Sequence, residues 1–243
     1  MAAHVTPATF VSDDAAVFDA LSHPLHMRRI GGGSETDVYA AEGAGYVVKF
    51  KRDLSGSPER VLAHALRHRA VSELFAAYLG DEHAITSAYV VVGDEQGRAQ
   101  LLVVQPFLGD AQQLASVKYG ELSSQERQVI ARQLRDLVRR ALRCWRATGH
   151  LPDLHGTHSV SAAERRWLNT AAAAPRRIWR FVAREHLLRS HNLLLAGGPE
   201  PHVVLVDYDP VRWRSPLRAL YHAARWVLFW RDDWLIRRLE RSP

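Results

Sequence analysis

The sequence predicts an α+β protein of two lobes, with a β-rich first half and a helical second half. Short β-prone runs and one long helical pattern fill residues 26–105. Helical patterns dominate residues 106–243, where they are interrupted by one small hairpin pattern. We place the boundary near Pro106–Gly109. Residues 1–25 form an N-terminal arm, with a short helix expected around Asp14–Leu21.

The composition is typical of a soluble globular protein. Of the 243 residues, 47% are hydrophobic and 24% are charged. No apolar run reaches the roughly 18 residues that span a bilayer. The first residues lack the basic and apolar blocks of a secretory signal, and the single Cys144 cannot form an internal disulfide. We therefore expect a cytoplasmic protein, with Cys144 as a small buried residue on a helix.

Two hairpins and one helix are predicted in the first half. The runs Asp37–Ala41 and Tyr46–Phe50 are separated by a turn with two glycines. The runs Ala88–Val92 and Leu101–Gln105 flank a polar loop, so that each pair predicts a hairpin. Between the two pairs, Pro58–Leu79 lacks internal glycine and proline and repeats apolar residues at helical spacing, which predicts a helix.

The second half opens with a helix that has recognisable ends. Ser123 or Ser124 can cap it, Glu126 lies in its first turn, and an apolar stripe runs up to Gly149. The other expected elements are helices over 162–189 (broken at Pro175) and 217–240, and a hairpin between Leu193–Leu195 and Val203–Val206.

Positive charge is concentrated in one part of the chain. The net charge is +6, and residues 131–190 hold 13 arginines against four acidic residues, an excess of nine. Such a region can attract nucleotide, phosphorylated substrate, nucleic acid or anionic lipid. We favour the simpler interpretation that arginine, the default basic residue of this chain, decorates solvated helix faces. A nucleic-acid-binding module remains an alternative.

The tryptophans are interpreted as packing residues of the core or between helices. A stacking surface for nucleic acid would need them to alternate with arginine on one exposed face. The seven are Trp145, Trp167, Trp179, Trp213, Trp226, Trp230 and Trp234.

Residues 30–50 combine a glycine turn with a lysine on a strand. Glycine permits both the turn and a close approach of backbone N–H groups to phosphate oxygens. Val38 follows on the next strand, where it can cover a flat base. Lys49 lies on the third strand, where its ammonium can pair with phosphates. The glycines of the turn are Gly31, Gly32 and Gly33.

A second segment places an amide and a carboxylate at the base of a hairpin. Asn192 precedes a short apolar strand, and Asp207 follows the next one, 15 residues later. A hairpin of this length brings the two side chains together, and their hard oxygens suit Mg²⁺ completed by triphosphate oxygens and water. Asp209 is either a second metal ligand or a turn residue.

Together these segments resemble the protein-kinase-like superfamily, in its small bacterial, lipopolysaccharide-kinase-like form. The glycine turn and Lys49 resemble the glycine-rich loop and strand-three lysine. Asn192 and Asp207 resemble the catalytic-loop asparagine and the metal-binding aspartate, with Asp-Tyr-Asp in place of Asp-Phe-Gly. The resemblance covers roughly His26–Val211. It implies a two-lobed protein-kinase-like fold with a shortened helical C-lobe, and ATP and Mg²⁺ as cofactors.

The resemblance implies two further roles. A glutamate on the helix after Lys49 would pair with it, and Glu73 is the better candidate, with Glu59 second. The strand that ends at Gln105–Leu108 resembles the hinge, whose backbone would hold the adenine edge. The third glycine position of the loop is occupied by Thr36.

The chain departs from the family at the catalytic base. The usual aspartate lies five residues before the asparagine, where this chain has Leu187. Asp153 instead follows the long helix, in a segment similar to the D-L-H-x-x-N form of bacterial relatives, but His158 occupies the asparagine position. Either the loop is split, with Asp153 as the base and Asn192 returning after an insertion, or the base is lost. We favour the split loop. A ligand role for His155 or His158 is not favoured.

The expected activity is transfer of a phosphoryl group to a hydroxyl. Only 36 residues follow Asp207, which favours a small-molecule, sugar or lipid-linked acceptor over a peptide. A lipid-linked acceptor would bring the protein to a membrane surface. The principal alternative is a pseudokinase that binds nucleotide as a scaffold without efficient transfer.

Overall fold

The computed structural model describes residues 9–10, 27–32, 36–41, 43, 45–93, 98–156, 186–198, 200–208 and 217–241. They form an α+β fold of helices and antiparallel sheets, divided into two compact units. The first unit contains the described residues up to Glu73 together with 86–109. The second contains 74–85 and the described residues from Asp110 onward. Among the helices of these residues, none is both long and apolar enough to span a bilayer.

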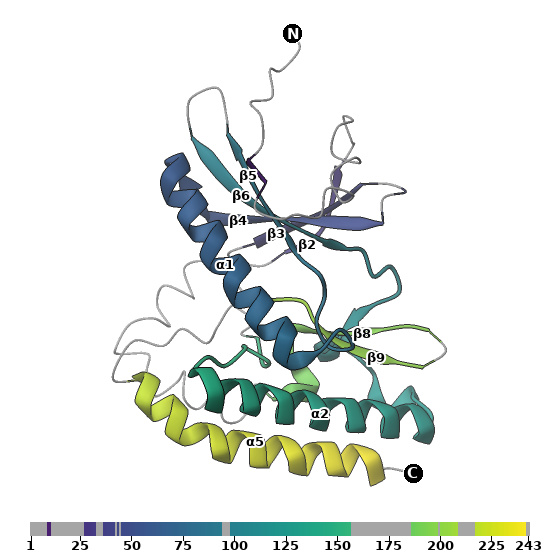
Figure 1. The fold of residues 1–243 in the computed structure, drawn as a ribbon. Helices are drawn as coiled ribbons and strands as arrows, with labels where there is room; N and C mark the ends of the chain where they lie inside the picture. Colours follow the sequence, from purple (N-terminus) through teal and green to yellow (C-terminus); the bar gives the residue numbers. More distant parts are fainter. Residues whose placement is uncertain are drawn as a thin grey trace, which may run out of the picture. The chain divides into compact units, whose positions relative to one another are not determined.

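A six-stranded antiparallel sheet forms most of the first unit (Figure 1). The strands follow the order β1-β5-β6-β4-β3-β2. Both predicted hairpins are confirmed, because β3 pairs with β4 and β5 pairs with β6. The sequence did not predict β1, which pairs with β5. The bounds are β1 Thr9–Phe10, β2 Met27–Gly32, β3 Thr36–Ala41, β4 Tyr46–Gly56, β5 Ala88–Gly93 and β6 Ala99–Pro106.

Helix α1 (Pro58–Leu79) has the bounds predicted from its periodicity. Its residues Val61 and Ala65 belong to one buried cluster with Val103 of β6. Residues paired across antiparallel strands share a face of the sheet, and Lys49 lies opposite Val103. Lys49 therefore lies on the face of the sheet that α1 covers.

The second unit is built on two long helices that pack together along their length (Figure 1). Helix α2 (Ser124–Thr148) begins with a capping box, in which Ser123 Oγ accepts from the Glu126 N–H and Glu126 accepts from the Ser123 N–H. It ends at Gly149 in the left-handed conformation. The predicted cap and end are confirmed, and Cys144 is buried as expected. Helix α5 spans Leu217–Arg241.

The remaining elements of this unit are short. The predicted hairpin is confirmed, and β7 pairs with its first strand to complete a three-stranded sheet of order β7-β8-β9. Most of the expected helix over 162–189 lies outside the described residues. The expected arm helix around Asp14–Leu21 lies wholly outside them. The bounds are β7 Gln112–Gln113, η3 Leu114–Ser116, η4 Tyr119–Glu121, η6 Leu187–Arg189, β8 Leu193–Ala196 and β9 His202–Leu205.

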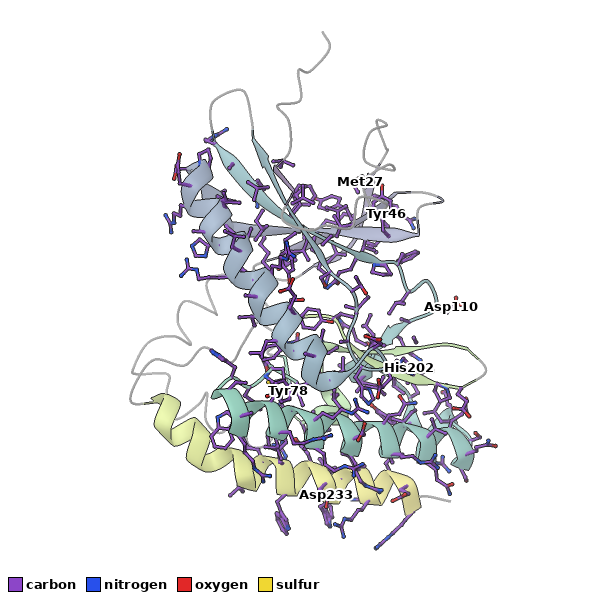
Figure 2. The ribbon with its side chains drawn as sticks, viewed as in Figure 1. Met27, Tyr46, Tyr78, Asp110, His202 and Asp233 are labelled. Atoms are coloured by element: carbon purple, nitrogen blue, oxygen red, sulfur yellow. The ribbon has the colours of Figure 1, made fainter. Side chains whose placement is uncertain are left out.

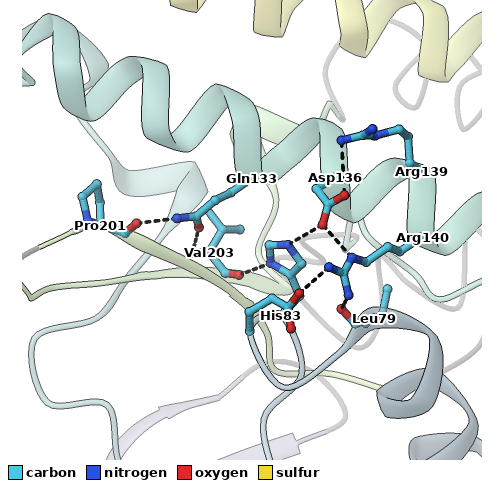
Figure 3. Close-up of polar contacts among 9 residues, drawn as sticks. Leu79, His83, Gln133, Asp136, Arg139, Arg140, Pro201 and Val203 are labelled. Atoms are coloured by element: carbon cyan, nitrogen blue, oxygen red, sulfur yellow. Dashed lines mark hydrogen bonds and ion pairs between the residues drawn. The ribbon is translucent and has the colours of Figure 1, made fainter.

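A polar network fixes β9 to helix α2 and to the turn after α1 (Figure 3). The buried His83 donates from Nδ1 to Val203 O at 2.9 Å, and its carbonyl accepts from the Leu205 N–H. Gln133 of α2 bridges the same strand, donating to Pro201 O at 2.8 Å and accepting from the Val203 N–H at 2.7 Å. These bonds fix the strand that leads directly to Asp207.

Arg140 of α2 closes the other side of this network. Its Nη1 donates to Leu79 O at 2.9 Å, so that it caps the last turn of α1. Its Nε donates to Asp136 at 2.6 Å, and the Asp136 carboxylate lies 3.6 Å from His83 Nε2.

We predict that Gln133→Leu destabilises the fold by about 2 kcal/mol, because it leaves the Val203 N–H and the Pro201 carbonyl without their partner. Equilibrium denaturation with urea would measure the loss. Gln128→Leu, at an exposed position of the same helix, is the matched control, with an expected change of at most about 0.5 kcal/mol. Equal losses in the two variants would show that the bridge contributes nothing.

Candidate functional site

The glycine turn lies at the end of the β2–β3 hairpin. Gly31 pairs with Val38, and Gly32 pairs with Asp37. Gly32 has φ +141°, and a Cβ there would lie 2.6 Å from Thr36 O, so this position requires glycine. Arg29 donates to the Asp37 carboxylate at 2.8 Å across the turn. The predicted Gly33 lies outside the described residues.

Val38 and Lys49 form one row across the sheet. Val38 lies opposite Lys49 in the β3–β4 register, and Lys49 lies opposite Val103 in the β4–β6 register. The three residues therefore share a face of the sheet. The candidate base-covering residue and the candidate phosphate-binding lysine are therefore direct neighbours on adjacent strands.

Glu73 forms an ion pair with a residue other than the predicted partner. Its carboxylate accepts from Arg69 Nε at 2.7 Å, one turn earlier on α1, and its side chain is 62% exposed. The polar residues on the buried side of α1 are His68, which stacks on Tyr89, and Ser72. The pairing of Glu73 with Lys49 stays a prediction.

One backbone donor of the predicted hinge is used within the fold. The Phe107 N–H donates to Gly45 O at 2.8 Å, just after β6 ends at Pro106. The buried Gln105 donates to Ser87 Oγ at 2.8 Å. The strand end is thereby tied to its neighbours, and the adenine-binding role stays a prediction.

In the second unit, Asp153 sits in a tight loop after α2. Its Oδ1 accepts from the backbone N–H groups of His155 and Gly156, each at 3.2 Å. Gly156 has φ +60°, and a Cβ there would lie 2.6 Å from Asn192 Oδ1. Glycine is therefore required both by the backbone conformation and by the close approach of Asn192.

Asn192 returns to this loop from 39 residues later in the chain. Its Nδ2 donates to the Asp153 carbonyl at 2.9 Å, and its Oδ1 is the atom that the predicted role as a metal ligand would use. The buried Ser190 fixes the same junction, since its Oγ donates to Leu154 O at 2.7 Å and accepts from the N–H groups of Asn192 and Leu193 at 3.1 Å.

Asp207 is held near Asn192 by a backbone hydrogen bond of the residue that precedes it. The Val206 N–H donates to Asn192 O at 3.0 Å, so the residue after it, Asp207, follows a backbone position that is fixed to Asn192. Burial raises the pKa of Asp153 above its usual value, and the nearby charge of Asp207 raises it further. The charge of His155 and the hydrogen bonds from the two backbone N–H groups lower the pKa of Asp153 and offset part of this rise. The two carboxylates are thus close enough to interact electrostatically.

A buried histidine–aspartate pair holds the Asp153 loop to helix α5. His155 Nε2 donates to Asp232 Oδ2 at 2.8 Å, and both side chains are at most 3% exposed. Arg231 donates to the other oxygen of Asp232 at 2.9 Å. Burial alone would raise the pKa of Asp232, but the hydrogen bond from His155 and the charges of His155 and Arg231 hold it below its usual value.

His186 lies in the same electrostatic environment. Burial, together with the charges of Arg231, Arg189 and His155, lowers its pKa to about 4, although the charge of Asp232 opposes the shift. His186 is therefore neutral at physiological pH.

Sequence reasoning missed Asp232, Ser190 and the structural role of His155. A signal for Asp232 was present, because a carboxylate within an apolar helix needs a partner. The same reasoning pointed to Glu73, which is exposed. Ser190 gave no signal, because a serine next to a motif is not distinctive by residue type.

The residues present fit Mg²⁺ bound together with a triphosphate. The described residues contain no group of three or more His, Cys, Asp or Glu side chains that could hold a metal alone. Mg²⁺ commonly takes only one or two carboxylates and completes its octahedron with phosphate oxygens and water. Asp207 and the Asn192 Oδ1 supply oxygens of this kind. His158 and Asp209 lie outside the described residues.

Comparisons with known protein families, with curated proteins and with solved structures gave no match.

We predict that Asp232→Ala destabilises the protein by about 3 kcal/mol, because it leaves His155 and Arg231 without their buried carboxylate. Asp233→Ala is a control on the adjacent residue. Its carboxylate is 37% exposed and pairs with Arg237 one turn away, so we expect a loss of about 0.5 kcal/mol. Urea denaturation compares the two variants, and similar losses would contradict the structural role of Asp232.

We predict that Asp153→Asn raises the melting temperature at neutral pH. Because its pKa is raised on folding, Asp153 binds its proton more tightly in the folded state, and its ionisation destabilises that state. This destabilisation is absent below the pKa of the unfolded chain and is complete above the raised pKa. Asparagine can still accept the two backbone N–H groups.

Melting curves of the Asp153→Asn variant across pH would measure the gain, which should shrink as the solution is acidified. Asp81→Asn, in the exposed turn after α1, is the control and should show no such trend. A variant that is less stable than wild type at neutral pH would contradict the assignment.

Proposed function

We propose that the chain is an ATP-dependent phosphotransferase of the protein-kinase-like fold, acting on the hydroxyl of a small molecule, a sugar or a lipid-linked acceptor. The observation that carries the proposal is the convergence of Asp153, Asn192 and Asp207 within the second unit. Asn192 bonds to the Asp153 carbonyl across 39 residues of sequence. A split catalytic loop accounts for this, because Asp153 then supplies the carboxylate that Leu187 cannot.

The roles of the other residues follow from their chemistry. Asn192 and Asp207 would hold Mg²⁺, which neutralises the charge of the triphosphate. From the first unit, the glycine turn and Lys49 would bind phosphate oxygens, and Val38 would cover the base. These assignments supply charge neutralisation and positioning, the two main contributions to phosphoryl transfer.

Asp153 would orient the acceptor and take its proton. The acceptor oxygen attacks the γ-phosphorus, the bond from that phosphorus to the bridging oxygen breaks, and ADP leaves. The hydroxyl proton passes to the Asp153 carboxylate. A raised pKa makes this carboxylate a stronger base than an ordinary aspartate, which suits the role.

A pseudokinase remains the second candidate, and the environment of Leu187 favours it. Leu187 is fully buried in the turn η6, so the position of the usual base is part of the core. If Asp153 serves only to shape its loop, the site would bind nucleotide without transferring phosphate. Nucleotide binding and turnover therefore need separate measurements.

We predict that ATP with Mg²⁺ stabilises the protein by about 2.7 kcal/mol at a hundredfold excess over Kd. Lys49→Ala should lose the stabilisation, and Asp207→Asn should lose the part that depends on Mg²⁺. Thermal unfolding with ATP, with and without EDTA, measures both. Lys118→Ala and Asp233→Asn are the matched controls, since Lys118 is an exposed lysine in an i,i+3 ion pair.

Turnover then separates the two candidates. ADP release with candidate hydroxyl acceptors should fall about 100-fold or more in Asp153→Asn, the usual contribution of a general base. Stabilisation by Mg²⁺-ATP without turnover in wild type would establish the pseudokinase. Equal stabilisation of wild type and Lys49→Ala, or no stabilisation at all, would overturn the nucleotide site.

A further inference from the structure

Helix α5 is apolar on two opposite sides. The inward side contains Leu228, Phe229, Ile236 and Leu239, which are all buried. On the outward side, Val227 is 62% exposed, Trp230 is 72% exposed and Trp234 is 52% exposed. The spacing of three and four residues places these three in one stripe. The prediction that the tryptophans pack inside the protein is therefore wrong for Trp230 and Trp234.

Arginines continue the exposed stripe toward the end of the helix. Arg237, Arg238 and Arg241 are exposed, and at about 100° per residue they lie with the apolar residues within an arc of about 100°. The Arg238 guanidinium lies 5.8 Å from the centre of the Trp234 ring. We call this surface the Trp–Arg face, which consists of Val227, Trp230, Trp234, Arg237, Arg238 and Arg241.

The acidic residues of this stretch are turned away from the Trp–Arg face or neutralised. Asp232 is buried against His155. Glu240 pairs with Arg135 of α2, and Asp233, labelled in Figure 2, pairs with Arg237 at 2.8 Å. The Trp–Arg face itself contains three arginines and no acidic residue. The outward surface therefore combines apolar rings with net positive charge.

This combination matches the interface of an anionic membrane. Tryptophan favours the headgroup region, where the ring is partly buried and the indole N–H stays hydrated. Arginine extends its apolar stem along the ring plane while its guanidinium reaches lipid phosphates. A helix can lie in the plane of the interface with such a face buried to the depth of the headgroups.

Two other occupants fit less well. A second copy using the same face would bring two arginine clusters together, and like charges across an interface are unfavourable. Single-stranded nucleic acid needs aromatic rings for stacking along a basic groove, and the exposed Val227 extends an aliphatic surface that has no partner there.

We propose that the Trp–Arg face of α5 binds the surface of an anionic membrane through lipid headgroups. The proposal needs neither ATP nor phosphoryl transfer, and it stands or falls separately from the proposed activity. Binding combines burial of the tryptophan rings with attraction between arginine and lipid phosphate. It should therefore depend on both anionic lipid and ionic strength.

The test is co-sedimentation of the full chain with vesicles of phosphatidylcholine, with and without phosphatidylserine, in the absence of nucleotide. We expect the protein to bind the vesicles that contain phosphatidylserine, and to bind those of phosphatidylcholine alone at least about tenfold more weakly. Binding to the anionic vesicles should fall as salt is added. The double variants Trp230→Ala/Trp234→Ala and Arg238→Gln/Arg241→Gln should each weaken binding about tenfold or more.

Matched controls exclude a general effect of exposed residues. Leu66→Ala removes an exposed apolar side chain from α1, and Arg132→Gln/Arg143→Gln removes two exposed arginines from α2. Both should bind as wild type does, and unchanged melting temperatures confirm that all variants fold.

Three outcomes would overturn the proposal. The first is absence of binding to anionic vesicles at low salt. The second is equal binding by the Trp–Arg variants and their controls. The third is a wild type that does not bind vesicles but binds single-stranded nucleic acid, or self-associates in sedimentation equilibrium, when the Trp–Arg variants lose that binding or self-association.

Discussion

The hydroxyl of Ser190 makes the junction on which the candidate site depends. It donates to the Leu154 carbonyl and accepts from two successive backbone N–H groups, all within a fully buried environment. A buried polar group that lost these partners would cost free energy, so the three bonds hold the junction in one arrangement. Asn192 is thereby set against the Asp153 loop, and strand β8 starts from a defined position.

Two helices stabilise this junction from different directions. Helix α2 fixes the strand that leads to Asp207, through Gln133 and the His83 network. Helix α5 fixes the loop that carries Asp153, through the buried bond between Asp232 and His155. The same helix presents Trp230 and Trp234 to solvent, each two positions away from Asp232 in the sequence. Its inward side thus serves the site while its outward side is free to serve another purpose.

Local elements could be predicted from the sequence because their signals are local. The bounds of α1, the capping box of α2 and the hairpins follow from periodicity, caps and turns that span only a few residues. The meeting of Asp153 with Asn192 was expected only through the resemblance.

What could not be predicted depends on long-range contacts or on the choice of a face. The His155–Asp232 bond joins residues that are 77 positions apart, and no spacing rule indicates it. The exposure of Trp230 and Trp234 was misjudged because α5 is apolar on both sides, so its pattern does not reveal which side is inward. Glu73 was chosen as an acid in an apolar helix, although an arginine one turn away supplies its partner.

The clamp around Ser190 also bears on how the length of this protein can vary. It fixes both ends of the stretch 157–185, which separates the Asp153 loop from the Asn192 segment. The entropy of closing a loop grows only with the logarithm of its length, by about 0.6 kcal/mol for each doubling. A change in the number of residues between the two fixed ends would therefore alter this closure entropy little, so evolution could vary the length of the connection without separating the Asp153 loop from Asn192.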